Sequence, residues 1–512
     1  MLNLNTLSSE RLVFGDFYHS IPEGFLFITI IWGLILVTCV NTENNMFVTL
    51  RLNRLVQIIS FLNIAFYFII ISQQTWTISL SIFNMNCSVS LFILGIKIIV
   101  AFLTIILLEL YSNSCLYNIR AYASHYTLII TLTILFFLLL VTAVNFIAFF
   151  ISLIGLSLGT YILLFKDMEF SPLSRESGIK YYYLSTFSSG LALYGICLIY
   201  YIFNTFNFTT IRVWIESTLV VGNFEVDTSI LIFCLILLIT GLLFKVSLFP
   251  CHLWAPEVYE GSPDLVMAFF ILPLKLVTVA VLSQLLIYVF EQLANIWQPI
   301  ILFSAIGSLI WGGFAAIFEA RIKKFMAYTS INQLGFLFIG VICLTETAYD
   351  SVYFYLHIYI LMNLVFVIIL IILKITTESS ITFISDLTDY QIAILRIDLP
   401  IITFLIPIIF SMAGIPPLAG FFSKYFILLE AIKVSLVGSV VIALVTSLIS
   451  CYYYINILKM NIFDYVSHNV TIIFPFGLLL TIIITNIYII FFILIIYLIK
   501  SIYFVVNIIN DV

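Results

Sequence analysis

Long apolar runs recur along almost the whole chain, and each is long enough to cross a lipid bilayer as a helix. A spanning helix needs about 20 mostly apolar residues, because the hydrocarbon core of a bilayer is about 30 Å thick. Of the 512 residues, 63% are hydrophobic and only 9% are charged, which excludes an ordinary soluble domain. The sequence predicts an all-α polytopic membrane protein with about fourteen transmembrane helices, at 24–41, 55–79, 91–111, 126–143, 145–165, 181–203, 229–249, 264–289, 297–318, 326–345, 350–374, 400–429, 435–459 and 473–500.

The positions of Lys and Arg predict how these helices are oriented. Basic residues are enriched in the loops that remain on the side of synthesis. Loops after odd-numbered runs contain twelve of the 20 Lys and Arg residues, and loops on the opposite side contain four. We therefore expect both termini on the outer side of the membrane. The many Phe and Tyr residues and the excess of Ile over Ala resemble those of AT-rich organellar genes, so a chain encoded in an organelle is expected.

The composition also limits the ligands and partners. A net charge of −5 spread over few charged residues gives no indication of nucleic-acid binding. The 8 cysteines form no CxxC pair, so neither a zinc site nor an iron-sulfur cluster is predicted on this chain. Membrane lipids and other membrane proteins are the expected neighbours.

Two lysines lie inside apolar segments on either side of a proline-rich stretch. Lys245 ends one apolar run, and Lys275 lies deep in the next, two residues after Pro273. A lysine at the centre of a membrane helix costs roughly 2.5 to 3.5 kcal/mol on insertion scales, so such residues usually serve a function. Irregular backbone at membrane depth is tolerated only when it is buried in protein or lines a wet cavity. The residues expected to break the helix between the two lysines are Pro250, Pro256, Gly261 and Pro263, and the stretch therefore predicts an ion path.

A second interrupted segment follows near the C-terminal end. SMAGIPPLAGFFSKYFILL, residues 411–429, combines helix-breaking residues with Lys424. If helices 4–8 and 9–13 are two copies of one unit, Lys245 and Lys424 each lie on the fourth helix of their unit. Because five is odd, the second unit is expected to be inverted relative to the first, as in secondary transporters. Two unrelated proline-kinked helices are the alternative.

The helix count and the two expected five-helix repeats predict four regions. They are divergent N-terminal helices 1–3 (1–125), a first antiporter-like repeat of helices 4–8 (126–289), a second, inverted repeat of helices 9–13 (290–460) and a C-terminal helix 14 (461–512).

Several motifs resemble the subunit 2 family of NADH:ubiquinone oxidoreductase, respiratory complex I. WAPEVYEGSP is the most discriminating, because sister antiporter-like subunits differ after the shared His-Leu-Trp. The resemblance is good from about 229 to 454 and extends to the rest only as membrane helices. The motifs are FKVSLFPCHLWAPEVYEGSP (244–263), LPLK (272–275), RIKKFMAYTSINQLGF (321–336), YILMN (359–363), SMAGIPPLAGFFSK (411–424) and YYY (452–454).

The resemblance implies a fourteen-helix, antiporter-like subunit of the membrane arm, beside other membrane-arm subunits. In that family, lysines matching Lys245, Lys275 and Lys424 form a chain of protonatable groups. Burial disfavours the charged form of an amine, so small changes around a buried lysine can switch its charge. The complex is expected to use FMN, iron-sulfur clusters, NADH and ubiquinone on other subunits. We expect no redox centre and no cofactor on this chain.

One departure concerns the carboxylate that the family places on the fifth helix. Here Ile154 occupies its position, and no acid occurs between His125 and Phe165. Glu109 on the third helix is the candidate replacement. In the alternative interpretation, Glu109 lies near a helix end and simply reaches a lipid headgroup or a loop cation.

Three further polar residues lie within predicted helices. His357 could continue a proton path, since imidazole titrates near neutral pH, or be a hydrogen-bonded packing residue. Asn332, in the tenth helix, could supply an amide to a water chain. Lys97 lies near the start of the third helix, and we expect its long stem to carry the amine to the interface.

Three function classes follow. The favoured one is a proton-translocating subunit of a redox-driven pump, an H+-translocating NADH:ubiquinone reductase. The second is an Mrp-type cation/proton antiporter or a hydrogenase membrane subunit, which share this helix pattern. The third is a structural subunit that has lost transport, suggested by the missing carboxylate.

Overall fold

The computed structural model describes residues 21–35, 58, 64, 80–82, 87–117, 123–165, 172–221, 228–377, 399–463 and 476–490. The predicted helix at 55–79 lies outside these residues except for two positions. Parts of the predicted first and last helices, 36–41, 473–475 and 491–500, also lie outside them.

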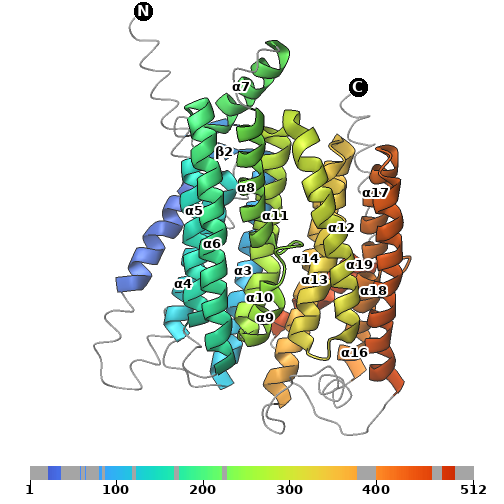
Figure 1. Ribbon diagram of the computed structural model, residues 1–512. Helices are drawn as coiled ribbons and strands as arrows, with labels where there is room; N and C mark the ends of the chain where they lie inside the picture. Colours follow the sequence, from blue (N-terminus) through green and yellow to red (C-terminus); the bar gives the residue numbers. More distant parts are fainter. Residues whose placement is uncertain are drawn as a thin grey trace, which may run out of the picture. The chain divides into compact units, whose positions relative to one another are not determined.

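The chain divides into two compact units (Figure 1). The first unit comprises Met1–Val246 and Gly261–Trp297, and the second comprises Ser247–Glu260 and Gln298–Val512. The chain therefore leaves the first unit within a loop, returns to it, and leaves again at Trp297.

The first unit is a helical bundle. Its labelled helices are α3 (Leu91–Tyr117), α4 (Ala123–Thr142), α5 (Phe146–Phe165), α6 (Pro172–Phe203), α7 (Phe208–Val221), α8 (Thr228–Val246), α10 (Asp264–Phe269), η1 (Phe270–Leu274), α11 (Lys275–Gln284), η2 (Leu285–Val289) and η3 (Glu291–Leu293). Two short antiparallel strands, β1 (Leu80–Ile82) and β2 (Cys87–Val89), precede α3.

The second unit contains the remaining labelled helices, most of them long. They are α9 (Trp254–Gly261), α12 (Ala294–Phe318), α13 (Ile322–Ile342), α14 (Glu346–Thr377), α16 (Leu399–Ala413), α17 (Ala419–Lys433), α18 (Val437–Phe463) and α19 (Phe476–Ile490), with α9 and α12 each crossing the unit boundary. α13 is buried along nearly its whole length and packs against α14 and α17.

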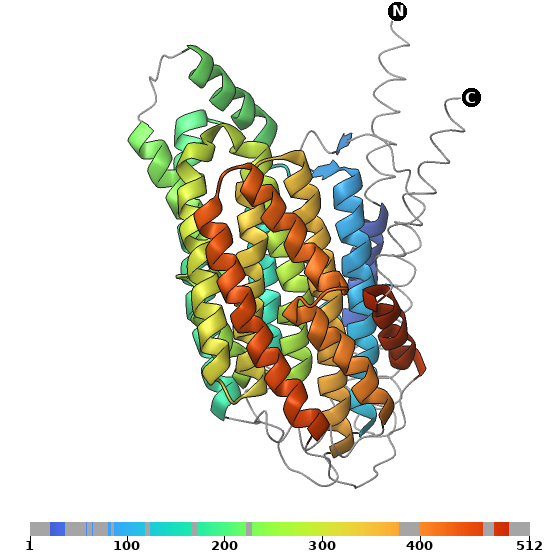
Figure 2. The ribbon, with the colours of Figure 1, turned by 90° about the vertical axis from the view of Figure 1, so that its right-hand side faces the viewer.

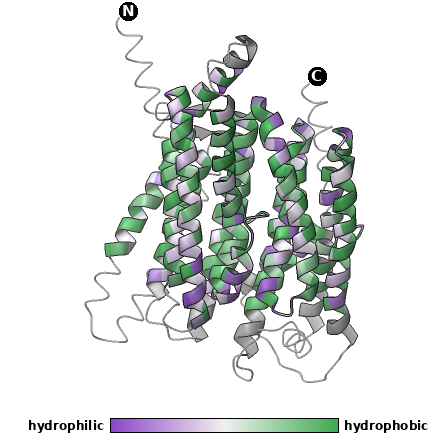
Figure 3. Cartoon of the chain, in the orientation of Figure 1, coloured by the Kyte–Doolittle hydropathy of each residue, from purple (hydrophilic) through white to green (hydrophobic). Residues whose placement is uncertain are grey.

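The structure confirms an all-α membrane fold. Among the described residues, ten helices are long and apolar enough to cross a bilayer. Hydrophobic residues cover most of their length, and hydrophilic residues gather near the helix ends (Figure 3). The total of fourteen helices and the inverted repeats remain predictions.

α6 and α8 pack closely because their facing residues are small. An added Cβ at Gly241 of α8 would lie 2.7 Å from the Ser188 carbonyl oxygen of α6, and one at Gly195 would lie 2.9 Å from the Leu238 backbone nitrogen. Both distances are shorter than van der Waals contact, so neither position has room for a side chain. The close packing fixes α8, which carries Lys245.

The expectation for Lys97 is wrong. Its side chain is only 1% exposed, and its Nζ lies 2.5 Å from Glu23 Oε1, on the helix Ile21–Ile35. A carboxylate within reach of the amine allows the charge to stay inside the protein, so the stem does not extend to the interface.

Candidate functional site

The first helix interruption follows α8 directly. α8 ends at Val246, and Ser247 has a φ of 68°, in the left-handed region that side chains rarely adopt. A cis Phe249–Pro250 peptide bond follows, and a new helix, α9, begins at Trp254. The backbone is therefore irregular for several residues, as the prolines predicted.

Lys245 is the second-last residue of α8 and is buried, with 5% of its surface exposed. Within the described part of the chain, its Nζ has no hydrogen-bond partner. A buried amine without such a partner is costly when charged. The arrangement suits a group that gains and loses a proton.

Lys275 follows a distortion of its helix. Residues 270–274 form the π-helical turn η1, which contains Pro273. Proline has no backbone N–H, so the regular hydrogen-bond ladder lacks a donor two residues before the lysine. Such π turns often occur at functional sites. Lys275 is 1% exposed and begins α11, which packs against α3, α4 and α8.

The second interruption separates α16 from α17, and Figure 2 shows it as a short loop between two orange helices. Gly414 has a φ of 85°, and the Pro416–Pro417 bond is cis. Gly414 also leaves room for the lysine, because an added Cβ would lie 3.3 Å from Lys424 Nζ.

Lys424 points back across this interruption. Its Nζ donates hydrogen bonds to the carbonyl oxygens of Met412 (3.1 Å) and Ala413 (3.4 Å), at the C-terminal end of α16. The free carbonyls of a helix C-terminus carry partial negative charge and favour a cation. The Nζ also lies 5.2 Å from the ring centroid of Phe336, in a cation–π arrangement. Lys424 is 7% exposed, so its charge is held inside the protein.

Glu109 and Ile154, the two positions that bear on the missing carboxylate, lie on different helices. Glu109 is half-buried on α3, and Ile154 is half-buried on α5, which packs against α4 and α6. Glu109 as the replacement carboxylate stays a prediction.

His357 lies on α14 and faces α19. Its ring meets Tyr488 edge to face, with the centroids 6.0 Å apart. This contact is typical of packing. A proton-relay role for His357 stays a prediction.

A buried polar cluster joins α13, α14 and α18, and we call it the α13 polar network. The Tyr355 hydroxyl donates to Gln333 Oε1 at 2.8 Å, and Asn332 Nδ2 donates to the Tyr453 hydroxyl oxygen at 3.4 Å. Tyr454 lies beside Tyr453, with the ring centroids 4.6 Å apart. The network consists of Asn332, Gln333, Tyr355, Tyr453 and Tyr454, all of them buried.

The sequence indicated part of this network. The sequence predicts that Asn332 could supply an amide to a water chain, and the YYY motif at 452–454 is part of the family resemblance. Gln333 was missed, although it accepts the Tyr355 hydrogen bond. The presence of Gln among apolar residues was the only available signal, because a buried amide requires partners.

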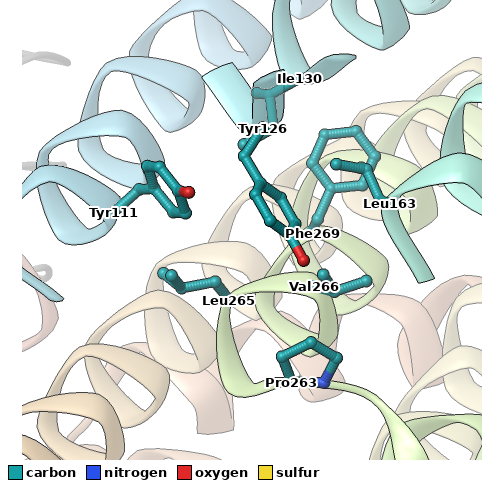
Figure 4. Close-up of a pocket in the computed structure, with 8 residues that line it drawn as sticks. All are labelled: Tyr111, Tyr126, Ile130, Leu163, Pro263, Leu265, Val266 and Phe269. Atoms are coloured by element: carbon teal, nitrogen blue, oxygen red, sulfur yellow. The ribbon is translucent and has the colours of Figure 1, made fainter. Parts of the chain in front are cut away.

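A small cavity lies in the first unit, where the ends of α3, α4, α5 and α10 meet (Figure 4). Its volume is about 40 Å³, far below the 300 to 1,000 Å³ of typical small-molecule pockets. The Tyr126 hydroxyl points toward Val266, and the Tyr111 and Tyr126 ring centroids lie 5.4 Å apart. The cavity has room for about one water molecule and is too small for a quinone.

The basic residues that begin α13 pair with the end of α9. Glu260 forms ion pairs with Arg321 and with Lys324, the latter at 3.0 Å between Lys324 Nζ and Glu260 Oε2. Both partners lie in the second unit. These pairs anchor α9, and therefore the irregular segment before it.

The chain is similar to known proteins in sequence and in fold. The model of the NADH:quinone oxidoreductase/Mrp antiporter transmembrane family matches residues 143–450, more than half of the chain. The chain belongs to this family. NADH-quinone oxidoreductase subunit N of Beijerinckia indica is 36% identical over 339 residues, covering 66% of this chain and 68% of the relative. NADH-ubiquinone oxidoreductase chain 2 of Marchantia polymorpha is 34% identical over 336 residues, covering 64% and 65%.

Solved structures share the fold of this antiporter-like family member. A chain of respiratory complex I from Thermus thermophilus is similar with a TM-score of 0.69 and 21% identity, covering 91% of this chain and 96% of that one. A chain of the Mrp complex from Dietzia has a TM-score of 0.69 and 15% identity, covering 88% and 81%. The fold is thus shared by a chain of a respiratory complex I and a chain of an Mrp complex.

Proposed function

We propose that this chain is the proton-translocating, antiporter-like subunit 2 of the membrane arm of complex I. The observation that carries the proposal is the burial of Lys245, Lys275 and Lys424, each beside a break or distortion of its helix. Relatives named as NADH-quinone oxidoreductase subunit N or chain 2 support the assignment to this complex.

The three lysines have different surroundings, which suits sequential occupation by a proton. Lys424 has two helix-end carbonyls and an aromatic face that stabilise its charged form. Lys245 has no hydrogen-bond acceptor among the described residues, so its charged form is less stabilised. A proton moving along the chain of amines would rest on Lys424 longer than on Lys245.

The redox chemistry belongs to other subunits in this proposal. FMN, the iron-sulfur clusters, NADH and ubiquinone would be bound elsewhere in the complex, and this chain would use the released energy by changing the surroundings of its lysines. Its partners are the other membrane-arm subunits, including neighbouring antiporter-like subunits.

We further propose that the chain lies in the mitochondrial inner membrane with both termini in the intermembrane space. The twelve-to-four distribution of Lys and Arg supports this orientation. Residues 126–289 and 290–460 are proposed as the two inverted repeats, each with one interrupted helix.

Substitution of Lys275 tests the function. We expect Lys275→Ala to lower proton pumping and coupled NADH:quinone turnover, while NADH:ferricyanide activity of the assembled complex stays unchanged. Ferricyanide takes electrons before the membrane arm is needed, so this activity is the control for assembly. Unchanged pumping would contradict the proposal.

Two alternatives make different predictions. An independent antiporter or hydrogenase subunit, suggested by the fold shared with the Mrp complex, would purify without flavin and iron-sulfur subunits of an NADH oxidoreductase. A transport-inactive structural subunit, suggested by Ile154, would tolerate neutralisation of all three lysines without a change in proton stoichiometry.

A further inference from the structure

Phe336 contacts both Lys424 and Tyr355, a member of the α13 polar network. Its ring centroid is 5.2 Å from Lys424 Nζ and 6.5 Å from the ring centroid of Tyr355. Phe336 is fully buried on α13, three residues after Gln333 and therefore on the same side of the helix. The ring thus neighbours both the Lys424 amine and the tyrosine whose hydroxyl is hydrogen-bonded to Gln333.

The α13 polar network contains groups that can accept a hydrogen bond. The Tyr355 hydroxyl uses its hydrogen to donate to Gln333 Oε1 at 2.8 Å, which leaves its oxygen lone pairs able to accept. The Gln333 carbonyl oxygen only accepts, so Gln333 cannot pass a proton along and instead fixes the direction of Tyr355. Asn332 Oδ1 is also buried, with no hydrogen-bond partner among the described residues. Polar groups of this kind stabilise a water molecule.

We propose that Phe336 is a gate that separates Lys424 from the α13 polar network. The inference rests on the proposed function. In the position observed, the ring covers the ammonium and excludes water from the space between Lys424 and Tyr355. When the ring moves, the ammonium leaves the α16 carbonyls and donates to a water held by Tyr355. One N–H bond of the ammonium then breaks, the water oxygen accepts the proton and gives up one of its own hydrogens to a second water held at Asn332 Oδ1, and the amine remains neutral.

The gate has a physical basis in the low polarity of the ring. An apolar constriction prevents conduction by excluding water, and a small displacement restores it. The face of the ring at the same time attracts the cation, which holds Lys424 at the closed gate. Phe336 is therefore a positioning residue for Lys424, and it acts without accepting the proton itself.

Phe336→Ala tests the proposal in the assembled complex reconstituted into liposomes. Removal of the ring opens the gate, so we expect faster passive proton influx into NADH-free vesicles and loss of most of the NADH-driven ΔpH, with NADH:ferricyanide activity retained. Phe338→Ala is the matched control, because Phe338 lies on the same helix, is equally buried and loses the same volume. The control should keep the ΔpH.

A second variant covers the case in which Phe336→Ala does not assemble. Phe336→Tyr keeps the ring and adds a hydroxyl, which places a hydrogen-bonding group between Lys424 and Tyr355. It should also increase passive proton influx. Normal influx in an assembled Phe336→Tyr or Phe336→Ala complex overturns the gate, as does an equal increase in Phe338→Ala.

Lys424→Met distinguishes failure of the gate from failure of the function. If Lys424→Met lowers pumping while the Phe336 variants behave as wild type, the gate is wrong and the function stands. If Lys424→Met pumps as well as the wild type, the proposed function is wrong.

Discussion

Gly420 should not tolerate even a methyl group. It lies at the start of α17, where this helix meets the last turn of α16, and an added Cβ would lie 1.9 Å from the Ser411 carbonyl oxygen. Carbon and oxygen atoms in contact are normally about 3.3 Å apart, so Gly420→Ala requires the two helices to separate by about 1.4 Å. The obstructing atom belongs to the backbone and cannot rotate away.

The magnitude follows from the clash and from helix propensity. Overpacking typically lowers the free energy of unfolding by about 1 to 3 kcal/mol. Because the obstructing backbone atom cannot move, we expect a loss near the upper end of this range, about 3 kcal/mol. Alanine is more favourable than glycine within a helix by about 0.5 to 1 kcal/mol, which offsets part of this loss. We expect a net loss of about 2 kcal/mol in the free energy of unfolding. The displacement would also break the 3.1 Å contact of Lys424 Nζ with the Met412 carbonyl oxygen, one turn further along α17.

Two measurements on the assembled complex check this prediction. Gly420→Ala should lower the temperature at which half of the NADH:quinone activity is lost, and should reduce the ΔpH formed per NADH oxidised. Gly438→Ala in α18 is the control, since no described atom lies within 4 Å of its added Cβ. The reasoning is refuted if Gly420→Ala matches the wild type in both measurements, or if Gly438→Ala is equally impaired.

Three substitutions of carboxylate side chains test the packing. Glu23→Leu leaves the buried Lys97 amine unpaired and should destabilise by about 3 kcal/mol; adding Lys97→Met should restore the thermal midpoint of activity, and a double variant no better than the single one would contradict this. Glu260→Gln weakens the pairs that anchor α9 and should cost about 1 kcal/mol or less, because Arg321 is half exposed; hydrogen exchange of the α9 amides should accelerate, whereas unchanged exchange would show that packing alone holds α9. Glu430→Gln weakens the hydrogen bonds from Thr345 and Thr347 that tie α17 to α14, which should cost about 1 kcal/mol; a thermal midpoint equal to that of the wild type would argue against this role.

Hydropathy was sufficient to locate most of the described helices, because apolar runs in a membrane protein have few alternatives to a helix. The predicted run at 264–289 coincides with the apolar span Asp264–Val289. The prediction at 181–203 began too late, since α6 starts at Pro172. The polar sequence PLSRESGIK concealed this start, although proline favours the first position of a helix. α7, of 14 residues, is too short to give a spanning signal and was not predicted.

The side-chain contacts were harder to predict than the helices. Proline and glycine indicated both interruptions, because their effect on the backbone is local. The partner of Lys97 could not be predicted, since Glu23 is 74 residues away and only packing of the helix Ile21–Ile35 brings them together. Likewise, nothing in the sequence indicated that the carbonyl oxygens of Met412 and Ala413 would accept from Lys424, because these acceptors are backbone atoms common to all residues.

The most direct test of lysine-based proton transfer is a map of ordered water in the assembled complex, at a resolution that shows individual molecules. The account predicts water molecules and polar side chains in a continuous hydrogen-bonded path that joins the Nζ atoms of Lys245, Lys275 and Lys424. Amines surrounded by dry apolar packing, or directed to lipid headgroups, would contradict it.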